Sequence, residues 1–342
     1  MSQSLDIAVI GATGTVGETL VQILEEREFP VGNLYLLASG ESAGASVPFK
    51  GRNLRVRDVA EFDFSLVKLA FFAAGEAVTR SFASKAVAAG CSLIDLSGAL
   101  DPAVAPSLVP EANPQLLETL VAPYQLTSPS ASAVALACVL APLKDLAKPQ
   151  RLSVMASLAV SSRGREGVTE LARQTAELLN ARPLEPRFFD RQIAFNILAQ
   201  AGAPDAEGHI ALERRLAGEV RQLLGEPALR VSATCALAPV FFGDSLAVSL
   251  VAEQAVDVTA VRGRLAQAPG VEFVEEEGDY PTAVGDAVGQ DSVYVGRVRG
   301  GLDDPCELNL WIASDNARKG AALNAVQSAE LLIKHYLSKI LT

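Results

Sequence analysis

Three glycines near the start of the chain have the spacing of a phosphate-binding loop. Gly11, Gly14 and Gly17 form a G-x-x-G-x-x-G pattern directly after the apolar run at residues 5–10. Glycine permits a tight turn and close backbone approach, and the free N–H groups at a helix N-terminus attract a pyrophosphate. A turn that merely requires glycine is the alternative interpretation. The position of the pattern, between an expected strand and an expected helix, favours a dinucleotide site.

The residues after the second expected strand bear on which dinucleotide fits. An NADP site needs a cation there for the 2′-phosphate, whereas Glu41 would repel that phosphate and accept hydrogen bonds from a plain ribose. The sequence therefore favours NAD and disfavours NADP, although a solvated surface glutamate and no cofactor at all stay open. The candidate cofactor contacts in these two segments are Gly11, Thr13, Gly14, Thr15, Val16, Gly17, Ser39, Glu41 and Ser42.

The elements that must position this loop alternate between strands and helices. Apolar runs predict strands at residues 5–10, 34–39, 69–74 and 92–97. Residues 15–27 carry apolar side chains at helical spacing, and a later Ala-rich helix is expected to end with Gly90 at C′. This alternation predicts a parallel sheet with helices on both faces, as in a Rossmann-like domain.

The pattern changes near Pro149, which indicates a second domain of the α+β class. Helices are expected at residues 164–180 and 211–224, and a long helix at 316–337. Longer β runs, at residues 151–160, 229–237, 244–253 and 292–299, predict a mixed or antiparallel sheet with helices to one side.

Composition narrows the class of protein. The 342 residues suggest two domains, and the net charge of -11 makes nucleic acid and anionic membranes poor partners. No signal peptide and no apolar run long enough to span a membrane is evident, so we expect a cytoplasmic protein. Cys91, Cys138, Cys235 and Cys306 are widely spaced, and the chain has only two histidines, so we expect reduced thiols and no metal site.

Taken together, several segments resemble the aspartate-semialdehyde dehydrogenases, and among them most of all the Usg-type paralogues. The segments run in order along nearly the whole chain: GATGTVGETL, LLASGESAGASVPFKG, FFAAG, LIDLSGAL, LVPEAN, QIAFN, ATCALAPVFFGDS, VGRVR and DNARKGAALNAVQSAELL. The resemblance implies a Rossmann-like dinucleotide-binding domain at residues 1–130, completed by a C-terminal helix at 316–342. It also implies an α+β dimerisation domain with a mixed sheet at 131–315, a homodimer, and a family role in amino-acid biosynthesis.

The family's reaction makes definite demands on residue types. A cysteine thiolate attacks the aldehyde, a histidine moves the proton, hydride passes to NADP, and phosphate cleaves the thioester. The resemblance places Ala131 where the family has its cysteine and Asp244 where it has its histidine. A methyl group cannot attack a carbonyl, and an unperturbed carboxylate is a weaker base near pH 7 than an imidazole.

The family's substrate-binding positions also differ in this chain. The resemblance places Leu158 at a glutamine position, and Leu237 and Asp101 at two arginine positions. One interpretation matches Arg215 to the family's phosphate-binding lysine. The alternative is that Arg215 is an ordinary arginine on the surface of a helix. Asn316 corresponds to an asparagine that reaches towards the nicotinamide amide, and a helix N-cap is its alternative role.

Other residues could replace the missing groups only with difficulty. Cys138 lies two helical turns beyond Ala131 and is better explained as a buried thiol. Ser130 or Ser132 would need an adjacent base and would give an ester-level intermediate. Asp244 is also expected to accept a hydrogen bond from the backbone of its own turn.

Three hypotheses follow from these residues. The first is a non-catalytic member of the family, a pseudoenzyme that keeps the fold, the dimer and a residual NAD site. The second is an active NAD-linked oxidoreductase with another substrate and mechanism. The third is a protein-interaction module with a vestigial nucleotide groove.

Overall fold

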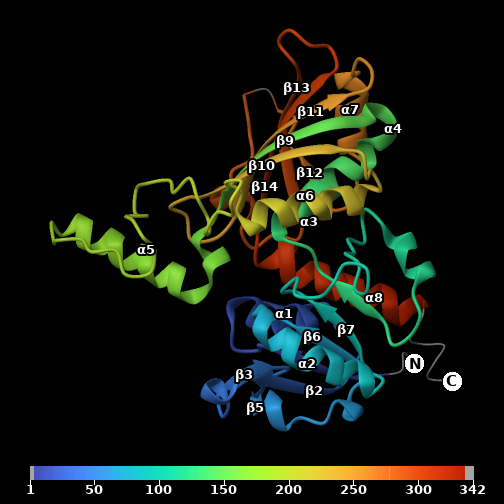
Figure 1. Ribbon diagram of the computed structural model, residues 1–342, viewed down its shortest axis with the longest axis vertical. Coiled ribbons are helices and arrows are strands. Elements are labelled where there is room, and N and C mark those ends of the chain that lie inside the picture. The colour runs from blue at the N-terminus through green and yellow to red at the C-terminus, as the bar shows by residue number, and fades with distance from the viewer. Residues whose placement is uncertain (1–3, 277, 336–342) are drawn as a thin grey trace. The chain divides into compact units, whose positions relative to one another are not determined.

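The computed structural model describes residues 4–276 and 278–335 of the chain. These residues form two compact units (Figure 1). Residues up to 129 form the first unit together with residues from 321 onward, and residues 130–320 form the second. Among the described residues, no helix is long and apolar enough to cross a membrane.

The first unit is built on a six-stranded sheet in the order β5-β2-β1-β6-β7-β8. All of its strand pairs are parallel, which confirms the predicted sheet. The strands are β1 (Leu5–Ile10), β2 (Val31–Ala38), β5 (Arg57–Asp58), β6 (Leu69–Phe72), β7 (Ser92–Asp95) and β8 (Gln125–Thr127). A separate hairpin joins β3 (Ser46–Phe49) to β4 (Arg52–Arg55).

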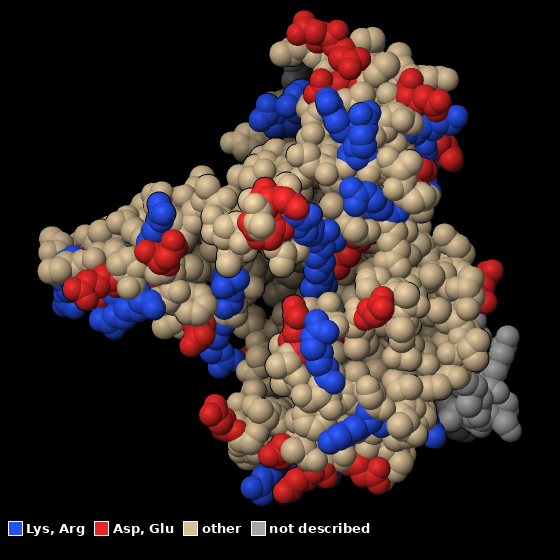
Figure 2. Space-filling view, in the orientation of Figure 1, with Lys and Arg blue, Asp and Glu red and all other residues tan. Residues whose placement is uncertain are grey.

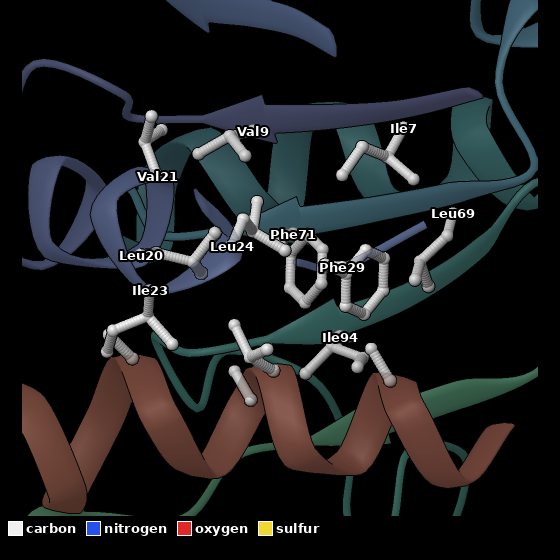
Figure 3. Packing of buried hydrophobic residues seen from close by; sticks show 14 of the residues in the cluster. Ile7, Val9, Leu20, Val21, Ile23, Leu24, Phe29, Leu69, Phe71 and Ile94 are labelled. Atoms are coloured by element: carbon white, nitrogen blue, oxygen red, sulfur yellow. The ribbon is translucent and has the colours of Figure 1, made fainter. Parts of the chain in front are cut away.

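Helices cover both faces of this sheet because successive strand residues point to opposite sides. Ile7 and Val9 pack with α1 (Thr15–Glu26) and α8 (Asn324–His335), and Figure 3 shows Leu20 and Ile23 of α1 directed into this core. The other face packs against α2 (Glu76–Ala88). Gly90, with φ of 78°, follows the C-cap of α2, so its predicted position at C′ is confirmed.

The second unit contains a mixed sheet in the order β10-β9-β11-β14-β13-β12, as predicted. β9 (Pro149–Leu158) is parallel to β10 (Arg230–Leu237) and antiparallel to β11 (Asp244–Ala252). The other strands are β12 (Val271–Phe273), β13 (Val293–Gly300) and β14 (Glu307–Ser314). β12 and β14 were not predicted from the sequence.

One face of the second sheet is covered by α3 (Ala131–Leu140), α6 (Ala211–Leu224) and α7 (Val258–Leu265). In β11 the side chains of Leu246, Val248 and Leu250 face this core, whereas Ala247 on the opposite face is exposed. A short helix α4 (Lys144–Ala147) precedes β9, and α5 (Gly164–Leu179) projects from the sheet edge (Figure 1).

The single long helix predicted at residues 316–337 is wrong at its start. A π-helical turn occupies Arg318–Leu323, and regular α-helix begins only at Asn324. The N–H of Gly320 donates to the carbonyl of Asp315 at 2.8 Å, which is the i to i−5 bond of a π-turn. Residues 336 and 337 lie outside the described part of the chain.

Candidate functional site

The glycine loop of the first unit has the close backbone packing that its sequence predicts. Gly11 has φ of 85°, and a Cβ atom there would lie 2.7 Å from the backbone of Ala73. A Cβ atom on Gly17 would lie 2.1 Å from the carbonyl oxygen of Gly11. Both positions therefore exclude any side chain, and α1 can begin directly against the end of β1.

The start of α1 is suited to hold an anion. Gly14 is its N-cap residue and is exposed, and a glycine has no side chain with which to cap the first N–H groups. Thr13, Thr15 and Val16 are half-buried around it. Free N–H groups and the positive end of a helix dipole fit a pyrophosphate.

Asp58 and Arg55 lie beside the segment after β2 and give it a mixed charge that the sequence did not reveal. Ser39 and Glu41 are exposed and Ser42 is half-buried. β5 runs beside β2 and brings Asp58 to Gly40, where a Cβ atom would lie 3.2 Å from Asp58 Oδ2. Pairing between distant segments creates this acidic neighbour, and no local sequence pattern encodes it.

In the second unit, Leu158, Leu237 and Asp244 converge at one edge of the mixed sheet. Leu158 and Leu237 are paired residues at the carboxyl ends of β9 and β10. The N–H of Ala159 donates to Oδ1 of Asp244 at 2.9 Å. Leu158 and Leu237 are buried, so this edge has an apolar lining where the family resemblance implies polar and cationic groups.

The expected hydrogen bond between Asp244 and its own turn is wrong. The Asp244 carboxyl accepts from the N–H of Ala159, which directly follows β9, rather than from its own turn. Burial, together with the nearby Asp315 carboxylate, raises the pKa of Asp244 to about 7, although the hydrogen bond from Ala159 opposes this rise. Its acidity is therefore close to that of an ordinary imidazole, rather than that of an exposed carboxyl.

Ala131 lies at the first position of α3 and is half-buried. A Cβ atom on Gly320 would lie 2.5 Å from the Ala131 methyl, so the two backbones are in close contact. Gly320 is bonded to Asp315, which follows Ser314, the strand partner of Asp244. Position 131 thus belongs to the same edge of the second unit as Asp244.

The buried carboxylate of Glu219 binds the residue that precedes Ala131. Glu219 accepts hydrogen bonds from the Ser130 N–H at 3.0 Å and from the Ser130 hydroxyl at 2.5 Å. Arg215 Nε donates to the same carboxylate at 2.7 Å. These donors engage both oxygens of the Glu219 carboxylate and hold the Ser130 hydroxyl in place. Ser132 is itself buried.

The thiols near this edge are poorly suited to nucleophilic chemistry. Cys138 and Cys235 are fully buried. Burial, with Glu213 and Asp244 nearby, raises the pKa of Cys235 to about 12, so the reactive thiolate is scarce near neutral pH. Within residues 4–276 and 278–335, no group of His, Cys, Asp or Glu side chains is placed to hold a metal ion.

Asn316 ties two loops together at the same edge. Its Oδ1 accepts from the Gly243 N–H at 2.9 Å, and its Nδ2 donates to the Ser161 hydroxyl at 2.9 Å. The capping interpretation is wrong for Asn316, because Asp315 accepts from the N–H groups of Ala317 and Arg318 instead. Asp101 lies in the first unit, where it is exposed and accepts from the Ala103 N–H.

Comparisons with known proteins agree with both units. Residues 6–120 match the family model for a semialdehyde dehydrogenase NAD binding domain, and residues 140–319 match the semialdehyde dehydrogenase dimerisation domain. A USG-1 protein homologue of Azotobacter vinelandii is 64% identical, covering 98% of this chain and 99% of its own. An aspartate-semialdehyde dehydrogenase of Legionella pneumophila is 40% identical over 99% of both chains.

The fold of the chain is also similar to that of a solved structure. A probable aspartate-semialdehyde dehydrogenase from Pseudomonas aeruginosa aligns with a TM-score of 0.95 and 61% identity, covering 98% of this chain and 100% of that chain. The order of the domains, the fold and the sequence identity therefore all agree with those of these relatives over nearly the full length. The chain belongs to the aspartate-semialdehyde dehydrogenase family.

Proposed function

We propose that this chain is a family member without semialdehyde dehydrogenase activity, which forms a homodimer and binds NAD in preference to NADP. The observation that carries the proposal is the sheet edge in the second unit. There Ala131 opens α3 beside Gly320, and Leu158, Leu237 and Asp244 lie at the ends of neighbouring strands. Without a thiol and an imidazole at these positions, no thiohemiacetal forms and no hydride leaves it.

The glycine loop supports dinucleotide binding. Gly11 and Gly17 form a backbone surface that any Cβ atom would block, and the uncapped start of α1 suits a pyrophosphate. Glu41 is exposed after β2, where it would repel a 2′-phosphate and accept hydrogen bonds from the ribose of NAD. A bound NAD would supply a hydride acceptor.

The open face of the second sheet supports the homodimer. The match to a family dimerisation domain covers this sheet. Met155 is 38% exposed there, and Trp311 and Ala247 neighbour it around a shallow hollow. A second copy would cover this face and remove its apolar area from water.

The state of Asp244 favours a second candidate function, an active NAD-linked oxidoreductase with another substrate. A group with a pKa of about 7 is well matched to proton transfer at neutral pH. In this alternative Asp244 replaces the histidine as acid and base, and the substrate needs no covalent capture.

One set of measurements separates these functions. We expect no oxidation of aspartate semialdehyde with phosphate and either dinucleotide, while an active relative such as the Legionella pneumophila enzyme provides the positive control. Turnover of roughly 1 to 1000 per second would refute the loss of activity. Calorimetry with NAD, NADH, NADP and NADPH should show tighter binding of the NAD forms, and no binding of any at millimolar concentration would refute both cofactor-dependent functions.

A further inference from the structure

A cavity in the second unit is lined in part by Leu237, whereas Ala131, Leu158 and Asp244 do not line it. Its volume is about 630 Å³. Leu198, Leu237, Phe188 and Phe189 provide apolar walls, and Arg163 provides a guanidinium. The lining also includes Asp190, Arg191, Asn196 and Gln200, so polar and apolar groups are both well represented, which suits a small molecule with one polar and one apolar end.

The position of Arg163 is fixed by the short turn that follows β9. In this turn the N–H of Val160 donates to Val240 at 3.0 Å, and the N–H of Ser161 donates to Phe241 at 3.1 Å. Gly164, with φ of 76°, then redirects the chain into α5. The backbone that carries the guanidinium is thus held in place before any ligand arrives.

The guanidinium of Arg163 keeps most of its donors available. Its Nη1 donates to the carbonyl of Ala201 at 3.2 Å, and in the described part of the chain no carboxylate forms an ion pair with it. The other cation of the cavity, Arg191, is exposed and contacts Asp190 at 3.4 Å. The cavity therefore presents one uncompensated positive charge.

The opposite wall is also held firmly. Leu198 and Leu237 exchange backbone hydrogen bonds at 2.9 and 2.8 Å. Gln174, fully buried in α5, accepts from the N–H groups of Ile193 and Ala194. The loop that closes the cavity is thus fixed to both α5 and β10, which lowers the entropy lost on binding.

We propose that this cavity binds an organic monocarboxylate with an apolar body, its carboxylate on Arg163 and its apolar part against Leu237 and Phe189. A guanidinium donates two parallel hydrogen bonds to a carboxylate, and the apolar walls reward a hydrocarbon body. One uncompensated cation suits one carboxylate rather than two. This site shares Leu237 with the sheet edge that carries the proposed function, but its binding is measured without any dehydrogenase reaction.

Calorimetry on the full-length chain tests the site with a matched pair of probes, 4-phenylbutyrate and its neutral amide. We expect the acid to bind roughly tenfold more tightly than the amide, because charged hydrogen bonds are lost with the amide. Arg163→Gln should remove that difference and leave amide binding unchanged. Thermal unfolding of the variant, which alters an exposed side chain, verifies that it folds.

Arg191→Gln is the matched control, since Arg191 lines the same cavity but contacts Asp190. It should change binding of the acid less than twofold. Equal binding of acid and amide, no binding of either at millimolar concentration, or an equal loss in both arginine variants would overturn the proposal. Tighter binding of succinate than of 4-phenylbutyrate would also overturn it.

Discussion

The glycine loop and the sheet edge of the second unit depend on the chain in different ways. At the loop, Gly11 and Gly17 act through their backbone, and any side chain there would collide with the fold itself. At the sheet edge, positions 131, 158, 237 and 244 are held by strand pairing and helix packing, whatever side chains they carry. A site that depends on side chains can therefore lose its catalytic groups while its backbone geometry persists. A site that depends on backbone cannot be changed without changing the fold.

The largest effect should follow a change in the loop. A Cβ atom on Gly17 would lie 2.1 Å from the Gly11 carbonyl oxygen, so Gly17→Ala must displace backbone. We expect it to lower the free energy of unfolding by more than about 3 kcal/mol and to abolish NAD binding. Urea denaturation and calorimetry measure the two losses.

Gly218→Ala in α6 is the control for that variant, because a Cβ atom there meets nothing within 4 Å. It should raise the free energy of unfolding by up to about 1 kcal/mol through helix propensity. If Gly17→Ala is no more harmful than Gly218→Ala, the loop does not have the tight packing described.

The next largest effect concerns Asp244 and pH. Its pKa of about 7 in the folded protein exceeds the ordinary value of 3.8, so folding favours the protonated form. The wild-type protein should lose stability as pH rises from about 4 to 7, because the unfolded chain releases this proton first. Asp244→Asn should remove the penalty, and its advantage at pH 8 should exceed that at pH 5 by on the order of 2–3 kcal/mol.

Asp286→Asn should behave in the opposite sense. Hydrogen bonds from Thr282 lower the pKa of the Asp286 carboxyl, so its charged form stabilises the fold above the ordinary pKa. That variant should lose stability more at pH 8 than at acid pH, as urea denaturation at each pH would show. A pH-independent effect of Asp244→Asn would mean that Asp244 is not buried as described.

A smaller effect is expected at the start of α3. Glu219→Gln removes the charge that binds Arg215 and the two donors of Ser130. The free energy of unfolding should fall by about 2 kcal/mol, because buried charged hydrogen bonds are lost. Ser130→Ala, which loses only the hydroxyl contact, should cost about half as much in the same denaturation experiment. Equal losses would show that the ion pair contributes nothing.

Ala131→Cys should have the smallest effect on stability. It also tests most directly the comparison between the glycine loop and the sheet edge. Position 131 is half-buried at the start of a helix, so we expect the free energy of unfolding to change by less than about 0.5 kcal/mol. Thiol titration should count one more reactive cysteine than in the wild type. Semialdehyde oxidation should stay absent, since no histidine or cationic anchor accompanies the thiol. Full activity from this single change would contradict the proposed loss of the other groups.

Periodicity predicted much of the fold correctly. The predicted helix at residues 211–224 agrees with α6, and the strand at residues 5–10 agrees with β1. β12 was missed because it has only three residues. β14 was not recognised, although Leu308, Leu310 and Ile312 alternate along it as in a half-buried strand. The helix that was expected to start at residue 316 begins instead with a π-turn, which depends on close contact between Gly320 and Ala131.

In the site, too, features set by neighbouring residues could be predicted from the sequence, whereas features set by distant residues could not. The glycine spacing is a local signal, and the structure places these residues as expected. The partner of Asp244 and the neighbour of Gly40 come from other segments of the chain, and the burial that shifts the pKa of Asp244 also depends on packing with other segments. Spacing alone carries no information about such pairings or about the loss of solvent.

The first unit is closed by residues from both ends of the sequence. Val326, Ala329 and Leu332 of α8 complete the core that β1 and α1 begin. During translation, the first 129 residues leave the ribosome while this helix is still unmade, whereas the second unit is continuous and can fold as it emerges. The first unit would thus be synthesised first and completed last, and until then its apolar sheet face would be a natural target for chaperones.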